Sequence, residues 1–140
     1  DAYDRSVMAV ASESIASGHI RILGQRSDIP DVLAASDLLV FPSIVPHFGR
    51  PIIEAGAMAK PVIVSNLGGA KELVVNGETG LLVSPGDTSE LAESITSVLT
   101  DPSQAKTMGH AGYLRARELF DAHRNAARTF EVYANVLDPA

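Results

Sequence analysis

The sequence predicts an α/β fold in which a parallel sheet is flanked by helices, with further helices towards the C-terminus. Short apolar runs alternate with segments of helical periodicity, which is typical of β/α units joined by right-handed crossovers. The apolar runs are nearly continuous, as expected for strands buried on both faces. Of the 140 residues, 46% are hydrophobic and 20% are charged, which is the balance of an ordinary globular domain.

Four segments are predicted as strands, because each is a short apolar run bounded by glycine, proline or polar residues. They are His19–Leu23, Leu38–Phe41, Pro61–Val64 and Thr79–Val83. The carboxyl ends of parallel strands share one edge of the sheet, and ligands of such sheets bind outside that edge. We therefore expect the loops Gly24–Asp28, Pro42–Arg50 and Ser65–Gly69 to converge there.

Helices are predicted from apolar residues spaced three or four apart and from capping residues at their ends. The expected helices are 1–17, Pro30–Ser36, Pro51–Ala59, Ala70–Val75, Ser103–Leu119 and Asp121–Leu137. One more helix is expected to begin at the capping box Asp87–Glu90 and to end at Asp101. Three of them carry a stripe of residues on one face, and for Pro51–Ala59 these residues are expected to be buried. The stripe residues are Val7, Val10, Ala11, Ser14 and Ile15; Ile52, Ile53, Ala57 and Met58; and Ala122, Ala126, Phe130, Tyr133 and Leu137.

Composition and missing motifs exclude several classes of function. The net charge of −6 argues against nucleic acid or anionic lipid as a partner of this part of the chain. There is no cysteine, which excludes disulfides and is compatible with a cytoplasmic location. No signal-peptide pattern and no apolar run of about 20 residues is present. Dinucleotide fingerprints, P-loops and paired zinc-binding histidines are also missing, so no metal and no cofactor is expected.

The stretch Phe41–Glu54 is the strongest candidate site. An apolar strand is followed by a loop that contains Gly49, and Pro51 suits the first turn of the next helix. A loop that leads into a helix N-terminus favours an anion, because free N–H groups and the helix dipole meet there. Glu54 lies one turn into this helix, so a phosphate ligand with nearby hydroxyl groups would explain both features.

Plain structural roles compete with each functional interpretation. Glu54 could be an acid favoured by the helix dipole alone, and Arg50 could be a solvated surface arginine rather than a phosphate contact. His47 could act as a general acid or base, but a loop histidine is more often a structural or surface group. Of Asp28 and Asp31, one is expected to cap the following helix and the other could contact a nucleobase.

Short motifs from Ile20 to Asp87 together resemble one enzyme family. They are Ile22–Asp28, Ala35–Ser43, Phe48–Ala55, Ala59–Val64, Gly68–Val74, Asn76–Val83 and Pro85–Asp87. In this order and spacing they are similar to the donor-binding, C-terminal half of the retaining glycosyltransferases of GT-B fold known as group 1 or family 4. The resemblance implies a Rossmann-like sheet and a nucleotide-sugar donor. It covers about half of the chain.

The resemblance also implies roles for individual residues. Glu54 matches the second glutamate of the family's Glu-x7-Glu motif, which holds the ribose hydroxyls of the donor. Arg26, through its backbone, and Asp28 match the loop around the nucleobase. The segment that faces the diphosphate and the sugar is matched by Gly49, Arg50 and Pro51, and Phe48 is expected to pack this loop.

The chain departs from the family pattern at the first glutamate, whose position is occupied by Pro46. No residue is therefore assigned as catalytic with certainty, and His47 or Arg50 could take over part of the contact with the transferred sugar. Pro51 also lacks an N–H for the phosphate, for which Arg50 could compensate. An alternative is a non-catalytic, glycosyltransferase-like module for nucleotide binding or protein contact, and a phosphate-binding domain of the flavodoxin kind is a third.

The chain is short for the family. Residues 1–140 are predicted to form a single, partial donor-binding domain without the acceptor domain, so that the isolated chain would be inactive. Expected partners are a nucleotide sugar or nucleoside diphosphate and the N-terminal domain of a parent chain. Self-association through an uncovered sheet edge is also expected. The predicted location is cytoplasmic, with peripheral attachment to a membrane through the parent left open.

Overall fold

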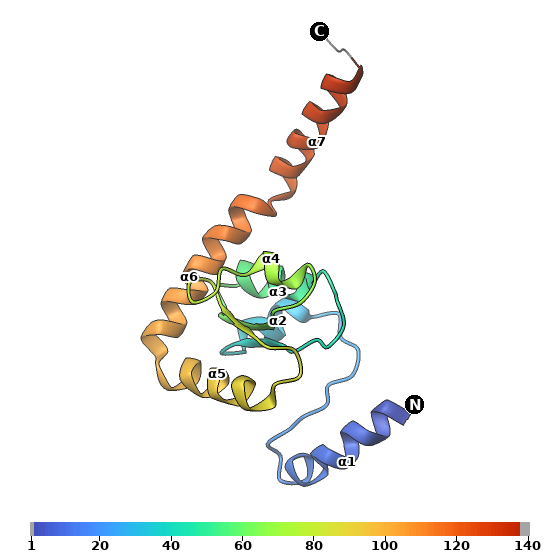
Figure 1. Cartoon of the computed structure of the whole chain (residues 1–140), viewed down its shortest axis with the longest axis vertical. Helices are drawn as coiled ribbons and strands as arrows, with labels where there is room; N and C mark the ends of the chain where they lie inside the picture. Colours follow the sequence, from blue (N-terminus) through green and yellow to red (C-terminus); the bar gives the residue numbers. More distant parts are fainter. Residues whose placement is uncertain (1, 138–140) are drawn as a thin grey trace.

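The computed structural model describes residues 2–137 and contains a parallel sheet of three strands. The strands are β1 (Leu39–Phe41), β2 (Val62–Ser65) and β3 (Leu81–Val83), in that order across the sheet. Leu39 lies opposite Val62 in the first pair, and Ile63 lies opposite Leu81 in the second. Figure 1 shows helices on both faces of this sheet, which confirms the predicted α/β fold.

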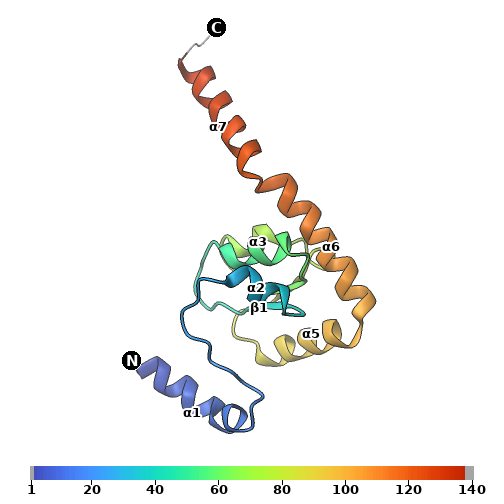
Figure 2. The same ribbon diagram turned by 180° about the vertical axis from the view of Figure 1, so that it is seen from behind.

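The helices fall into those that cover the sheet and those that extend away from it. Their bounds are α1 (Ala2–Ala16), α2 (Ile29–Ala34), α3 (Arg50–Ala57), α4 (Ala70–Leu73), α5 (Thr88–Thr100), α6 (Pro102–Leu119) and α7 (Ala122–Leu137). In Figures 1 and 2, α3 and α4 lie on one face of the sheet and α5 lies on the other, while α1 and α7 project outward. Asp1, which the sequence places in the first helix, lies outside the described residues.

The core consists of two clusters, one on each side of β2. Val62 and Val64 pack in the cluster that includes Ile52 of α3 and Leu73 of α4. Ile63, between them in the sequence, packs on the other side with Val83 and Val98. Successive side chains of a strand point to opposite faces, so β2 is buried on both, as its continuous apolar sequence predicts.

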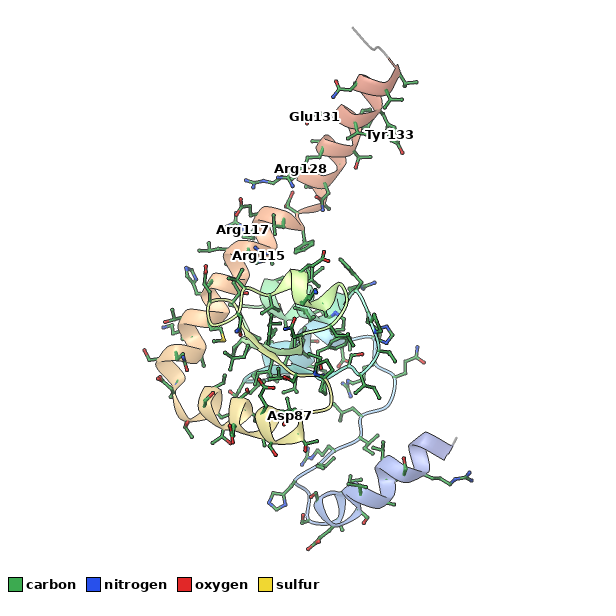
Figure 3. All side chains as sticks on the ribbon, viewed as in Figure 1. Asp87, Arg115, Arg117, Arg128, Glu131 and Tyr133 are labelled. Carbon is green, nitrogen blue, oxygen red and sulfur yellow. The ribbon has the colours of Figure 1, made fainter. Side chains whose placement is uncertain are left out.

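The capping box before α5 is confirmed in part. The carboxylate of Asp87, labelled in Figure 3, accepts from the backbone N–H of Ser89 and Glu90 over 3.1 and 2.9 Å. Glu90 does not reach back to Asp87 as predicted. Its carboxylate accepts instead from the N–H of Ser84, over 2.7 Å, and so ties the end of β3 to the start of α5.

The predicted strand His19–Leu23 is wrong, because this segment forms no strand in the structure. Ile20, Ile22 and Leu23 are 41%, 58% and 52% exposed. An extended segment becomes a strand only when a neighbouring strand pairs with its N–H and C=O groups. Within residues 2–137 no strand lies beside this segment, and the sheet therefore has three strands instead of the four expected.

The apolar face of α7 is exposed, and that of α1 is only partly covered, with Ala11, Ser14 and Ile15 half-buried. Val10 is 90% exposed, Phe130 is 77% exposed and Leu137 is 82% exposed. Figure 1 shows why, because α1 is separated from the sheet by a long connection and α7 continues outward from α6. Among the residues that the structure describes, no helix combines the length and the apolar character needed to span a membrane.

Helix α3 is buried along most of the predicted stripe, because Ile53 and Met58 are half-buried and pack against the same core cluster as Ile52. Only Ala57 of the predicted residues is exposed, and Ala55 and Gly56 are buried in addition. The reason is the crossing with α6: a Cβ on Gly56 would lie only 3.2 Å from the carbonyl oxygen of Gly112. Close approach of these backbones selects small residues on the side of α3 that faces α6.

Candidate functional site

The loops that follow β1 and β2 pack against each other at the carboxyl edge of the sheet. The N–H of Ala70 donates to the carbonyl of His47 over 3.0 Å. Gly68 has a φ of +58°, and a Cβ on it would lie 2.9 Å from the Cβ of Pro46. Residues 46–49, hereafter the 46–49 loop, are therefore held against the start of α4, and these two of the three expected loops do converge.

The 46–49 loop ends at the N-terminus of α3. Gly49 is the N-cap residue and has a φ of +80°, a left-handed conformation that favours glycine. A Cβ on Gly49 would also lie 2.6 Å from Cδ1 of Ile52, which is buried. Pro51 occupies the first turn, where its missing N–H would have no helical partner. The positive end of the α3 dipole therefore lies beside the 46–49 loop, as the sequence predicts.

Arg50 and Glu54 form an ion pair on the exposed side of α3. The distance from Arg50 Nε to Glu54 Oε1 is 2.8 Å. The side chain of Arg50 is 84% exposed, whereas that of Glu54 is 33% exposed. An exposed i, i+4 pair of this kind stabilises a helix by only about 0.3–0.5 kcal/mol, so little free energy keeps Arg50 in this position.

Arg26 and Asp28 form a second ion pair in the loop before α2. Arg26 Nε donates to Asp28 Oδ1 over 2.7 Å, and Arg26 Nη2 contacts Asp28 Oδ2. The hydrogen bonds from Arg26 hold the pKa of Asp28 below its ordinary value, against a smaller opposing effect of desolvation. Asp28 stands at the N-cap position of α2, but its side chain makes no capping bond there. The expected capping role is therefore replaced by the pair with Arg26.

An open cleft of about 450 Å³ lies between the start of α2 and the side of α3. Arg26, Arg50 and Glu54 line it with charged groups, so the Arg50–Glu54 pair and the arginine of the Arg26–Asp28 pair border the same space. Its apolar lining comes from Ile29, Pro30, Leu33, Ala57 and Met58. The structure thus places Arg26 and Ser27 of the Gly24–Asp28 loop beside Arg50 at the start of α3, although no strand precedes this loop. Figure 2 shows α2 and α3 side by side.

Other predicted site residues lie outside the lining of this cleft. Pro46, His47 and Phe48 belong to the 46–49 loop and are exposed, with Phe48 at 60%. Phe48 borders the start of α4, because a Cβ on Gly69 would lie 3.5 Å from Cδ2 of its ring. No His, Asp or Glu within the described part of the chain forms a group of three that could hold a metal ion.

The apolar side of the cleft was not predicted from the sequence. Ile29 and Leu33 lie one turn apart on α2, and Met58, which the sequence assigns to the core, is half-buried at the end of α3. The i, i+4 spacing of Ile29 and Leu33 is a signal that could have identified one wall. Only the packing of α2 against α3 makes the two walls face each other.

A parallel sheet whose carboxyl edge carries a glycine loop, a helix N-terminus and a carboxylate is the arrangement of a nucleotide-binding α/β domain. The family model of glycosyl transferases group 1 matches residues 4–115 of the chain. The chain therefore belongs to this family, which confirms the resemblance found in the sequence.

Individual relatives agree with this assignment. Glycogen synthase of Mycobacterium tuberculosis is 35% identical over 116 residues, which are 83% of this chain and 27% of the relative. Anabaena Alr3699/HepE, solved in complex with UDP, is similar with a TM-score of 0.90 and 32% identity, over 95% of this chain and 37% of that one. The same protein in complex with UDP-glucose gives a TM-score of 0.88 over the same shares of the two chains. The chain thus spans about a third of these relatives.

Proposed function

We propose that residues 1–140 form a partial donor-binding domain of a glycosyltransferase, and that the cleft between α2 and α3 binds a nucleoside diphosphate sugar. The observation that carries this proposal is that Arg26, Arg50 and Glu54 border one cleft that begins at the N-terminus of α3. The UDP and UDP-glucose complexes of Anabaena Alr3699/HepE support the choice of ligand.

The nucleoside would lie deepest in the cleft. Its base would pack on the apolar lining near Ile29 and Met58, beside the loop of Arg26 and Asp28. The carboxylate of Glu54 would accept hydrogen bonds from the ribose hydroxyls. A site that pairs with ligand hydroxyl groups strongly rejects analogues that lack them, because the buried acceptor is then left unpaired.

The diphosphate would lie towards the N-terminus of α3. Glu54 is four residues after Arg50, so the ribose and the phosphates would be separated by about 5–6 Å along the helix. Gly49 allows the backbone to come close to the anion, and the helix dipole favours negative charge there. Arg50 is mostly exposed and weakly held by Glu54, and it would turn to a phosphate oxygen, where a charge-assisted bond is stronger.

The reaction would be transfer of a glycosyl group with retention of the anomeric configuration. Preorganised positive groups would stabilise the departing diphosphate, so no metal is required by this proposal. Pro46 supplies no carboxylate for the transferred sugar, and His47 on the same loop is the nearest substitute in the sequence. An acceptor domain of the parent chain would complete the active site, and a cytoplasmic location is part of the proposal.

Nuclear magnetic resonance titration tests donor binding by the isolated chain. UDP, GDP and ADP are added separately to the ¹⁵N-labelled protein, and we expect at least one to shift the signals of Gly49 and Glu54. Glu54→Gln should weaken binding about tenfold, whereas Glu93→Gln, an exposed change on α5, should have no effect. If none of the nucleotides binds at millimolar concentration while the chain stays folded, the donor site is refuted.

A non-catalytic module for nucleotide binding or protein contact is the second candidate, and the observation that favours it is Pro46. By its resemblance to the family motif, this residue stands at the position of a sugar-contacting glutamate. It also lies against Gly68, because a Cβ there would come within 3.0 Å of its Cα. The two candidates differ in turnover by a longer polypeptide that includes this chain. Transfer or donor hydrolysis, with the product anomer assigned by its proton coupling, supports the enzyme. Nucleotide binding without turnover supports the module.

A further inference from the structure

Arg115 of α6 ties that helix to the end of α4. Its Nη2 donates to the carbonyl of Glu72 over 3.0 Å, and its Nε donates to the carbonyl of Leu73 over 3.2 Å. The side chain of Arg115 is half-buried and lies where α6 passes α4 (Figure 3). The last carbonyls of a helix have no partner within it, so a guanidinium is well suited to this position.

Helix α4 depends on contacts at both of its ends. It has four residues, and a single turn is not stable by itself in water. Its N-cap residue is Gly69, which has no side chain to cap the helix. At that end the N–H of Ala70 donates to the carbonyl of His47, and a Cβ on Gly49 would lie 3.5 Å from the Cβ of Ala70. One end of α4 is therefore held by Arg115, and the other end supports the 46–49 loop.

We propose that Arg115 is a positioning residue that acts through α4 to hold the 46–49 loop and the N-terminus of α3 in the arrangement that binds the diphosphate. This inference rests on the function proposed above and extends it to a residue that does not line the cleft. Arg115 does not contact the ligand. It fixes the carbonyls of α4, and α4 fixes the carbonyl of His47.

Arg115 should affect the binding of the diphosphate and not that of the nucleoside. The Arg26–Asp28 pair, beside which the base would lie, is formed within its own loop and has no contact with α4 among the interactions described. Loosening of α4 would therefore disturb the diphosphate end and leave the nucleoside end intact. If the 46–49 loop then adopts its binding arrangement about a tenth of the time, the dissociation constant of UDP rises about tenfold.

Titration with UDP and with uridine separates a positioning role from general destabilisation. The variants are Arg115→Met, which keeps the apolar stem, and Arg115→Lys, which keeps one charged donor. Arg117→Met is the matched control, since it removes an exposed arginine two residues away that lies over the ring of Tyr113. We expect Arg115→Met to weaken UDP binding about tenfold and uridine binding less than twofold. Arg115→Lys should recover part of the loss, and the control should leave both affinities unchanged.

An equal loss of UDP and uridine affinity in Arg115→Met, or unchanged UDP affinity, would overturn the proposal. Hydrogen exchange of the Ala70 amide provides a second measurement that needs no ligand. In Arg115→Met and Arg115→Lys the exchange of this amide should accelerate, while amides of β2 keep their rates. If the wild-type chain binds GDP or ADP instead of UDP, that nucleotide and its nucleoside replace UDP and uridine in these titrations. Should it bind none of the three nucleotides, the proposed function fails, and unchanged exchange at Ala70 would separately refute the support of α4 by Arg115.

Discussion

Arg50 Nε lies 2.8 Å from Glu54 Oε1, so the two residues proposed to contact the phosphate and the ribose pair with each other in the structure. Each residue of the pair would contact a different part of the ligand. The positive charge of Arg50 would attract a phosphate, and the carboxylate of Glu54 would accept from hydroxyl groups. Binding would exchange one internal contact for two contacts with the ligand.

Substitution of Arg50 tests this exchange. Arg50→Met should change the free energy of unfolding by less than about 0.5 kcal/mol, because an exposed i, i+4 pair contributes little. UDP affinity should fall about tenfold, whereas uridine affinity should be unchanged or slightly higher, since Glu54 no longer has a competing partner. The measurements are urea denaturation and titration with both ligands. An equal effect on UDP and uridine would contradict a phosphate role for Arg50.

The titration of Asp28 provides a test of the loop beside the base. Its pKa should lie below the ordinary aspartate value of 3.8, because Arg26 stabilises the charged carboxylate. Its side chain is 40% exposed, and solvent screens the pair. Since the folded pKa is the lower one, the pair contributes stability above pH 3.8 and loses it as the pH falls through the folded pKa.

Carboxyl-carbon chemical shifts of Asp28 followed against pH measure this directly. In Arg26→Gln the pKa of Asp28 should return towards the ordinary value, and Arg21→Gln, in the extended segment before the loop, should leave it unchanged. A wild-type pKa at or above 3.8 would show that the Arg26–Asp28 pair does not persist in solution.

Glycine is required at position 49 for two reasons: the backbone has a positive φ, and there is no room for a side chain. Gly49 and Gly77 have φ values of +80° and +79°, but a Cβ on Gly77 would meet nothing within 4 Å. Gly77→Ala should therefore lower the free energy of unfolding by about 1–2 kcal/mol from the backbone alone. Gly49→Ala should cost at least about 1 kcal/mol more, because Ile52 must move in the core. Equal losses in urea denaturation would show that Ile52 adapts freely.

Ala59 ends α3 in a conformation that glycine would adopt more easily. Its φ is +54°, and the N–H groups of Lys60 and Ala59 donate to the carbonyls of Ala55 and Gly56, which is the Schellman pattern. Ala59→Gly should therefore raise the free energy of unfolding by about 0.5–1 kcal/mol. Ala57→Gly, inside the same helix, should lower it by about 1 kcal/mol. A loss of stability in Ala59→Gly would contradict the strain assigned to this residue.

The exposed face of α7 predicts self-association of the isolated chain. Phe130, Tyr133 and Leu137 are 77%, 62% and 82% exposed and follow helical spacing. Sedimentation should show oligomers at high concentration, and Phe130→Asp with Leu137→Asp should shift the chain towards monomer. Arg128→Gln is the control in the same helix. A wild-type chain that remains monomeric throughout would refute this expectation.

Local signals predicted the parts of the site that depend on a single segment. The strand before Pro42, the glycine at the start of α3 and the acid one turn later all follow from spacing and from conformational limits of glycine and proline. The contacts between segments could not be obtained in this way. Neither the position of α2 against α3 nor the hydrogen bond from Ala70 to His47 has a signature in the sequence of either partner.

The sequence by itself determined the order of strands and helices, the ends of most helices and the family, because these depend on local periodicity, capping residues and short motifs. The tertiary structure decided which predicted elements found a partner. His19–Leu23 has the pattern of a strand but stays outside the sheet, and the apolar stripe of α7 stays exposed, since pairing and burial both require a neighbouring surface. The cleft likewise exists only because α2 packs beside α3.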